Sequence, residues 1–399
     1  MLVLIVLAAL TGVLTAQDLY IIEEHDQYGF ADRSGRAVIA PKYGVVKPFS
    51  EGLAPVYLNG RWGFIDPQGN MKIQPQFWDA DGFSSGVAAV HVKGGWGYID
   101  QTGTLVIQPR FQLARRFAEG VAPVRSESGW LFIDKNGTPV PNLTGFEDAT
   151  SFSEGLATVK VEGAWRFITH KDDFVFGQEW ANARPFRNSL ATVQAESGGR
   201  YGFIDHSGKY AIKPGFEDAK AFSEGLAAVR LNRRWGYVRT NGEMQIPNGY
   251  PLFADEFAGA LAVVSDPVTG AQMYVNTDGV VQFFKSRKPA EIERGTGDDY
   301  TMVTLHVSSV PPQADVYLIP AYIWDLGDQT RRTPSNLHES ELKDYIKEHF
   351  EYLIGKTDLQ TRVIEQTYVG LFLLGEDIQH RRLDLRIGEN SASVSFYKK

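Results

Sequence analysis

Short runs of alternating apolar and polar residues fill the first two thirds of the chain. Residues 53–58, LAPVYL, and residues 62–66, WGFID, alternate and are rich in residue types that favour β-strands. Residues 66–69, DPQG, have the composition of a type I turn, with Asp first, Pro second and Gly fourth. MKIQP (71–75) then predicts a third strand that ends at Pro75, where a missing N–H costs least. The pattern predicts a β-meander of three strands.

This meander recurs along the chain with a period of 34 to 36 residues. The aromatic residue that opens its second strand returns at Tyr28, Trp62, Trp96, Trp130, Trp165, Tyr201 and Trp235. Segments similar to FSEGLA keep the same spacing and begin at residues 49, 83, 117, 152, 186, 222 and 257. A further aromatic follows the third strand at residues 43, 77, 111, 146, 180, 216 and 250. Three markers in one register predict eight copies, with the terminal ones incomplete and Gln272 in the aromatic position of the last.

The strand after each FSEG segment has the most uniform composition. Its second residue is Ala and its fourth is Val in all seven copies, as at Ala54 and Val56. Residues i and i+2 share a face of a strand, and the opposite face begins with Leu or Val, so we expect burial on both faces. The recurrent Glu of the FSEG segment is expected to satisfy N–H groups of a turn. One meander of 34 residues cannot fold alone, so neighbouring copies must share a core.

The motifs WGFID-x-x-G, I-x-P-x-F and F-S-E-G-L-A resemble the bacterial WG-repeat family, whose members include many envelope and surface proteins. The resemblance covers residues 17–285 and implies a repeat array with a binding or scaffold role, without an enzyme activity or a defined ligand. Copies four and five depart from the motif, because Leu131 and Arg166 replace its glycine. Copy five also reads Thr169-His170-Lys171-Asp172 where the others have the D-x-x-G turn, so we expect that turn to be lost.

The expected fold class is therefore all-β. A propeller blade usually takes four strands, whereas 34 residues supply three good strands and at most one short one. This count favours an open, curved stack of eight repeats. An eight-bladed propeller-like ring, cut at one connector, remains the alternative.

The last third of the chain has a different pattern. Residues 286–300 are charged and nearly free of large apolar side chains, which is typical of a linker. Residues 301–399 are expected to form a small β-sandwich-like domain, with one amphipathic helix over 338–354. The stretch SVPPQADVYL (309–318) resembles the opening of a PEGA-type envelope β-sandwich, although Gln313 stands where that pattern has glycine.

The first 16 residues, MLVLIVLAALTGVLTA, carry no charged side chain and are short of the roughly 20 residues that a spanning helix needs. Small residues at Thr15 and Ala16 precede the polar Gln17, which predicts a signal peptide over 1–16 that is cleaved after Ala16. A retained anchor is the alternative. The mature chain is then expected to be exported to the periplasm, the cell surface or the medium, without a membrane span.

The composition excludes several kinds of functional site. A net charge of −8 argues against a nucleic-acid partner, and the absence of cysteine excludes disulfides and thiolate nucleophiles. The Asp of the D-x-x-G turn occurs in five copies, whereas a catalytic acid is needed once, so a turn-forming role is favoured. Asp79-Ala80-Asp81-Gly82 has half of a calcium-loop frame but lacks the later ligands. We predict no catalytic residue, cofactor or metal.

Two surplus aromatic residues are the candidate ligand-binding residues. Trp78 has no counterpart in the other copies, and Trp324 lies in the polar segment IWDLGD. Either could stack on a sugar or a peptide, and the competing interpretation is a packed core residue.

The favoured function is an exported, non-enzymatic binding or scaffold protein of the bacterial cell envelope, whose repeat surface meets a protein or glycan partner. One alternative is a protein that binds the cell wall or a polysaccharide. A second alternative is an enzyme with its site in the C-terminal domain or at the domain junction.

Overall fold

The computed structural model describes residues 18–267 and 270–286 with their side chains, and the backbone of the strands between residues 302 and 397. The chain divides into two compact units, Met1–Gly145 and Phe146–Lys399. The predicted signal peptide and Trp324 lie outside the described residues. Within the described residues, no helix is long and apolar enough to cross a membrane.

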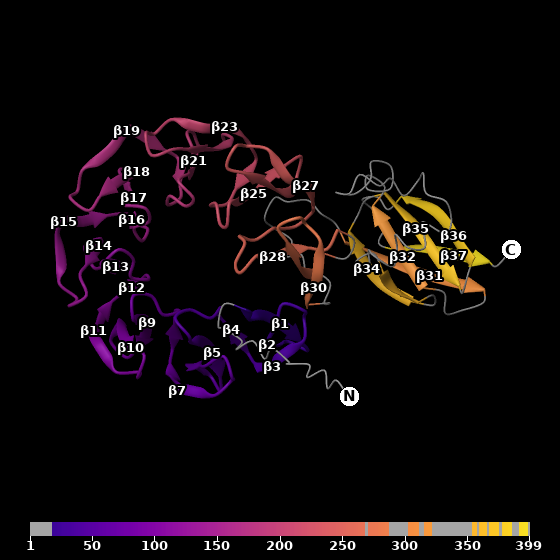
Figure 1. Cartoon of the computed structure of the whole chain (residues 1–399), viewed down its shortest axis with the longest axis horizontal. Helices are drawn as coiled ribbons and strands as arrows, with labels where there is room; N and C mark the ends of the chain where they lie inside the picture. The colour runs from indigo at the N-terminus through magenta and orange to yellow at the C-terminus, as the bar shows by residue number, and fades with distance from the viewer. Residues whose placement is uncertain are drawn as a thin grey trace, which may run out of the picture. The chain divides into compact units, whose positions relative to one another are not determined.

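Unit 1 contains four antiparallel sheets that follow one another along the chain (Figure 1). The first has three strands, β1 (Tyr20–Glu24), β2 (Gln27–Ala31) and β3 (Ala37–Tyr43). Each of the other three has four strands paired in chain order. Their bounds are β4 (Val45–Val46), β5 (Ala54–Leu58), β6 (Arg61–Ile65) and β7 (Met71–Phe77); β8 (Asp79–Ala80), β9 (Val87–Val92), β10 (Gly95–Asp100) and β11 (Leu105–Phe111); and β12 (Leu113–Ala114), β13 (Ala122–Ser126), β14 (Gly129–Ile133) and β15 (Pro139–Phe146).

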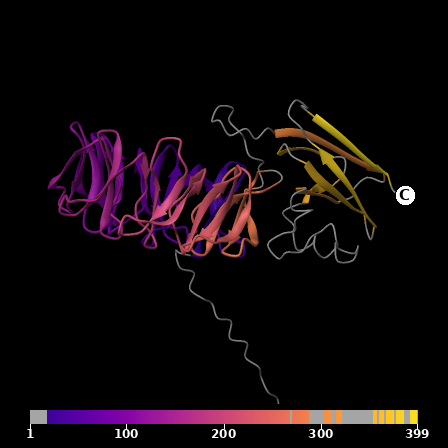
Figure 2. The same cartoon turned by 90° about the horizontal axis from the view of Figure 1, so that it is seen from above.

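Unit 2 continues the same pattern with three four-stranded sheets and one three-stranded sheet, which Figure 2 shows from above. The strands are β16 (Asp148–Ala149), β17 (Leu156–Val161), β18 (Ala164–Thr169) and β19 (Phe174–Trp180); β20 (Asn182–Ala183), β21 (Ala191–Gln194), β22 (Tyr201–Ile204) and β23 (Tyr210–Phe216); β24 (Asp218–Ala219), β25 (Leu226–Leu231), β26 (Arg234–Arg239) and β27 (Met244–Tyr250); and β28 (Leu261–Ser265), β29 (Gln272–Asn276) and β30 (Val281–Ser286).

The C-terminal part of unit 2 forms two further sheets. One has the order β34-β31-β37, and β31 and β37 run parallel. The other has the order β33-β32-β35-β36. The strands are β31 (Met302–Val310), β32 (Asp315–Pro320), β33 (Leu353–Lys356), β34 (Leu359–Ile364), β35 (Thr367–Leu374), β36 (Asp377–Asp384) and β37 (Ser391–Tyr397).

The predicted helix over 338–354 is wrong at its end, since Leu353 and Ile354 belong to β33, which pairs with β32. Its apolar positions are compatible with a helix, but pairing with an existing strand decides the conformation of the last residues. The rest of that predicted helix lies outside the described residues, and the PEGA-type resemblance stays a prediction.

The prediction of an all-β repeat array is confirmed. Each complete repeat has three strands of four to eight residues and one short strand of two residues, as in β4 to β7. In the last repeat sheet the short strand is reduced to a single bridge between Ala254 and Val264. An open stack and a closed ring differ in how the two units sit relative to each other, and both remain predictions.

The strand after the FSEG segment forms the core, as predicted. Ala54 and Val56 are fully buried on one face of β5, and Leu53 is buried on the other. The glycine that follows the motif tryptophan allows the third strand of the meander to approach the second closely. A Cβ on Gly63 would lie 2.6 Å from the carbonyl oxygen of Ile73 on β7, which is far inside van der Waals contact.

Copies four and five accommodate a side chain at this glycine position by changing the partner strand. Asn142 in β15 and Phe176 in β19 adopt positive φ values of 69° and 71°. Such irregular backbone is typical of a bulge, which moves the partner strand and leaves room for Leu131 and Arg166. Leu131 is buried, whereas Arg166 forms ion pairs with Glu179 and Glu162.

The expected loss of the turn in copy five is wrong. The N–H of Asp172 donates to the carbonyl oxygen of Thr169 at 3.2 Å, as glycine does in the other copies. The Thr169 hydroxyl accepts from the N–H of Lys171 at 3.2 Å and from that of Asp173 at 3.3 Å, so it replaces the usual carboxylate. Asp172 takes the positive φ of 67° that glycine takes elsewhere.

Candidate functional site

The recurrent carboxylates of the repeats serve as connections within the structure. Asp66 of the D-x-x-G turn accepts the N–H groups of Gln68 at 3.0 Å and Asn70 at 2.8 Å. Burial opposes ionisation of Asp66, but hydrogen bonds from Asn70 and Lys72 outweigh it and lower the pKa of the carboxyl below its ordinary value. The predicted turn-forming role of this aspartate is confirmed.

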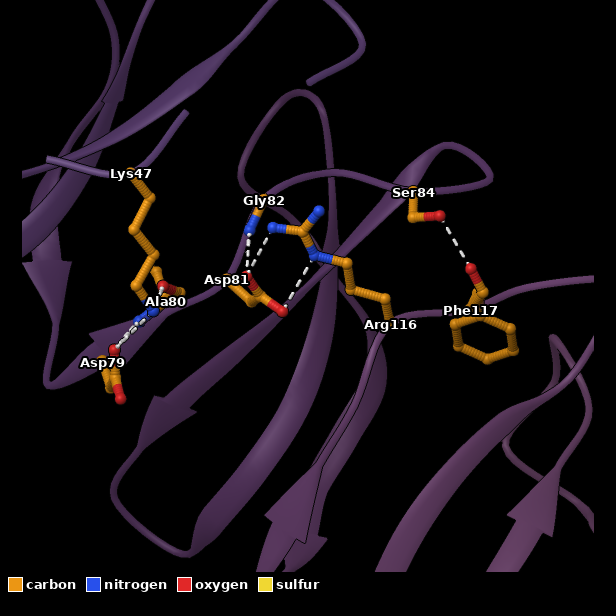
Figure 3. A network of polar contacts seen from close by, with 8 residues as sticks. All are labelled: Lys47, Asp79, Ala80, Asp81, Gly82, Ser84, Arg116 and Phe117. Atoms are coloured by element: carbon orange, nitrogen blue, oxygen red, sulfur yellow. Dashed lines mark hydrogen bonds and ion pairs between the residues drawn. The ribbon is translucent and has the colours of Figure 1, made fainter. Parts of the chain in front are cut away.

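The FSEG glutamates cap a turn, as predicted, but the turn belongs to the next repeat. Glu51 accepts the N–H groups of Ser85 at 2.7 Å and Gly86 at 2.9 Å. Glu224 accepts those of Gly259 and Ala260, each at 2.7 Å. Serines of the same segments add a second connection, because Ser84 Oγ donates to the carbonyl oxygen of Phe117 at 2.7 Å (Figure 3).

Trp78 takes no part in these connections between repeats and is an exposed aromatic residue. It lies between β7 and β8 and is 47% exposed. Its backbone N–H donates to the carbonyl oxygen of His91 at 2.8 Å. The Trp78 ring meets the imidazole of His91 edge to face, with centroids 5.2 Å apart. His91 in turn stacks on Trp96, at 5.4 Å with an interplanar angle of 15°. We call Trp78, His91 and Trp96 the aromatic cluster.

Strand register brings the cluster together. His91 on β9 faces Trp96 on β10 as its direct cross-strand partner, just as Tyr57 faces Trp62 one repeat earlier. Cross-strand partners have Cβ atoms about 5 Å apart, which permits ring contacts. Trp78, the residue before β8, contacts His91 edge to face.

The surroundings of Trp96 differ from those of three other motif tryptophans. A cation lies over the ring in three copies, with Lys47 over Trp62, Arg115 over Trp130 and Lys220 over Trp235 at 5.0, 4.4 and 5.9 Å. Those three tryptophans are buried. The corresponding position in the Trp96 copy is Asp81, so the ring has no cation there and stays half-buried against His91.

Two ion pairs hold β8 between the neighbouring sheets of unit 1 (Figure 3). Lys47 Nζ donates to the carbonyl oxygen of Ala80 at 2.7 Å and lies 3.4 Å from Asp79 Oδ1. Asp81 binds the Arg116 guanidinium in bidentate fashion, with Nη2 to Oδ1 at 2.8 Å and Nε to Oδ2 at 3.0 Å.

Burial of Asp81 opposes ionisation, but the Arg116 hydrogen bonds and charge outweigh it and lower the pKa of the carboxyl. The same hydrogen bonds raise the pKa of Arg116. In the calcium-like segment 79–82, Asp79 therefore pairs with Lys47 and Asp81 pairs with Arg116, so both carboxylates are bound to cations of the protein. The described residues hold no group of three or more acidic or histidine side chains that could bind a metal.

Polar groups without a protein partner surround the cluster. Within the described part of the chain, no hydrogen bond or ion pair reaches Asp79 Oδ2, the ring nitrogens of His91 or Lys93 Nζ. Asp79 uses Oδ1 alone, for Lys47 and for the N–H of Ala80. The site thus combines an exposed indole with one free acceptor and free donors.

Trp78 was predicted from the sequence as a ligand-binding candidate, and its exposure agrees with a surface role. His91 was missed. A signal for it existed, because His91 occupies the position before the hairpin at which Tyr57 packs on Trp62. A second signal was Asp81, the acidic residue at the position where three other copies place a cation over tryptophan.

Comparison with known proteins agrees with this architecture. The model of the WG containing repeat matches five stretches of this chain, residues 28–62, 62–95, 96–130, 132–165 and 201–235. The predicted WG-repeat resemblance is confirmed. No curated protein matches the chain.

Solved structures with partial similarity have varied functions. A eukaryotic initiation factor has a TM-score of 0.46 at 9% identity, covering 66% of this chain and 83% of that one. The dihydro-heme d1 dehydrogenase NirN has a TM-score of 0.45 at 13% identity, covering 66% and 72%. Virginiamycin B lyase from Staphylococcus aureus has a TM-score of 0.36 at 12% identity, covering 55% and 89%. Enzymes are thus among these distant neighbours.

Proposed function

We propose that this chain is an exported, non-enzymatic binding protein of the bacterial cell envelope, which uses the surface of its repeat array to hold a protein or glycan partner. The observation that carries the proposal is the exposed indole of Trp78, held on His91 and Trp96 and surrounded by polar groups without a protein partner. An exposed aromatic ring with adjacent donors and acceptors is a common element of binding sites.

Three further features support the proposal. The residues at which a catalytic acid would first be sought, the D-x-x-G and FSEG carboxylates, are engaged with backbone N–H groups. The predicted signal peptide over 1–16 directs the chain out of the cytoplasm. The WG containing repeats give a series of similar sheets, and repeat arrays offer extended binding surfaces.

The test measures export and binding together. The full chain is expressed in a bacterial host, and mass spectrometry of the exported product is expected to show Gln17 as its first residue. The purified product is labelled and sedimented with an isolated envelope fraction, and Trp78→Ala is expected to lose most of the retention. Phe174→Ala is the matched control, because Phe174 is also 47% exposed but belongs to β19, in another sheet than the aromatic cluster.

The proposal would be contradicted if the full chain stayed in the cytoplasm with residues 1–16 uncleaved. It would also be contradicted if the unchanged chain and the Trp78→Ala variant sedimented equally with the envelope fraction. The alternative of an enzyme places its site in the C-terminal domain or at the domain junction, and such a site would leave sedimentation independent of Trp78.

A further inference from the structure

The geometry points to a specific ligand class at the aromatic cluster. We infer that Trp78, with Asp79, His91 and Lys93, binds a neutral glycan of β-linked hexopyranoses through one sugar ring stacked on the indole. This inference rests on the proposed binding function and narrows its partner to a saccharide.

The first argument is the isolation of Trp78. In its own sheet, the other large apolar side chain that is strongly exposed is Val106, on β11 at the opposite edge from β8. Contiguous exposed apolar patches of several hundred Å² often mark protein interfaces. A single indole between polar side chains is too small an apolar area for that, but it matches one sugar ring.

The second argument is the chemistry of the polar groups. A hexopyranose with equatorial hydroxyls has a flat face of axial C–H bonds, which can lie on an indole, and a rim of hydroxyls. Each hydroxyl is both a donor and an acceptor. Asp79 Oδ2 is a free acceptor beside Trp78, and Lys93 Nζ and the imidazole of His91 supply donors.

The third argument is the charge of this rim. Asp79 Oδ1 lies 3.4 Å from Lys47 Nζ, so this carboxylate and its cation form a pair without net charge next to Trp78. Such a pair does not favour an anionic ligand, whereas the free oxygen of Asp79 can accept from a hydroxyl. Hydroxyl groups are therefore a better match than carboxylates or phosphates.

The fourth argument is rigidity. The Lys47 and Arg116 contacts fix β8 from both neighbouring sheets (Figure 3), and the His91 carbonyl fixes the backbone of Trp78. A ring that is already held in place loses less conformational entropy when it binds, which matters for a weak ligand such as one sugar.

Isothermal titration of the full chain with cellohexaose and with chitohexaose tests the inference. We expect saturable binding of at least one oligosaccharide and a loss of affinity of about tenfold or more in Trp78→Ala, which corresponds to about 1.4 kcal/mol or more. Trp78→Phe is expected to recover part of the affinity, and Phe174→Ala to bind like the unchanged chain.

A rim variant provides the second readout. Asp79→Asn keeps the bonds of Oδ1 possible but replaces the free acceptor with a donor, and we expect about a threefold loss of affinity. Circular dichroism of each variant shows whether it is folded.

Three results would overturn the inference: binding of neither oligosaccharide, equal affinity of Trp78→Ala and the unchanged chain, or binding of a proline-rich peptide but no sugar. If the oligosaccharides fail while envelope sedimentation still depends on Trp78, the ligand class is wrong and the proposed binding function stands. If sedimentation is also independent of Trp78, both are wrong.

Discussion

The carboxylate of Glu224 accepts a hydrogen bond at 2.7 Å from the backbone N–H of Ala260, which lies in the turn of the following repeat. A second bond of 2.7 Å comes from the N–H of Gly259. Ala260 has a positive φ of 66°, a conformation that an L-residue adopts at a cost. The glutamate therefore stabilises a strained turn in a neighbour rather than in its own repeat.

Replacement of Glu224 by alanine should destabilise the chain. The change removes two hydrogen bonds to a charged group, and we expect a loss of about 2 kcal/mol in the free energy of unfolding, measured as a lower urea midpoint. Glu127→Ala is the control, because Glu127 is exposed in the β13–β14 hairpin and has no contact of this kind. Equal midpoints for the two variants would show that the connection contributes nothing.

Replacement of Gly97 by alanine should be more damaging. The added Cβ would lie 2.5 Å from the carbonyl oxygen of Ile107 and 2.9 Å from the nitrogen of Pro109, so β10 and β11 must separate. We expect a loss of about 2–4 kcal/mol in thermal or urea unfolding. Gly215→Ala is the matched control, since its nearest atom would be 3.9 Å away, and it should cost less than about 1 kcal/mol.

The Asp81–Arg116 pair predicts a pH dependence of stability. The folded-state pKa of Asp81 is lowered, because the Arg116 hydrogen bonds outweigh its burial. The unfolded chain, with an ordinary Asp pKa of about 3.9, then binds more protons than the folded chain as the pH falls. The contribution of the pair is complete well above pH 4 and is lost as the pH falls through the folded-state pKa.

Asp81→Asn tests this sign. The variant should be less stable than the unchanged chain at pH 7, by about 1–2 kcal/mol, and the difference should shrink as the pH falls below about 4. Urea midpoints over pH 3 to 7 measure it, with Glu127→Gln as the control. A constant difference across this range would contradict the assignment.

Glycine in place of Asp172 should stabilise the chain. Asp172 occupies a positive φ of 67°, where the corresponding residue in other copies is glycine, as at Gly103 with φ of 87°. Relief of this strain is expected to raise the free energy of unfolding by about 0.5–1 kcal/mol. Asp173→Gly is the neighbouring control and should be destabilising, since no positive φ is relieved there. A thermal scan of both variants compares them directly.

Local signals made most of the repeat fold predictable. Alternation in residues 53–58 and the turn residues Asp66 and Gly69 act over a few positions, and the structure has strands and a turn there. The turn of copy five was harder to predict, because Thr169 and Asp172 reproduce it with other residue types. The end of the predicted helix over 338–354 failed because its last residues pair with β32, which is far away in the sequence.

The candidate site was predictable only in part. Trp78 was identified because the other copies have no aromatic residue at its position. Its contact with His91 depends on strand register, and the Arg116–Asp81 pair joins residues 35 positions apart. Such contacts are decided by packing between sheets, which a pattern along one strand does not encode.

The connections between repeats have a direction. Glu51 and Glu224 each provide a specific side chain, whereas the receiving groups are main-chain N–H groups at the third and fourth positions of the next segment. The residue type at these receiving positions varies, since Ser85 in one segment corresponds to Gly259 in the other. The third position is also the position of the glutamate, so a repeat such as the one with Ser85 keeps the contact from its predecessor but loses the carboxylate that it would offer to its successor.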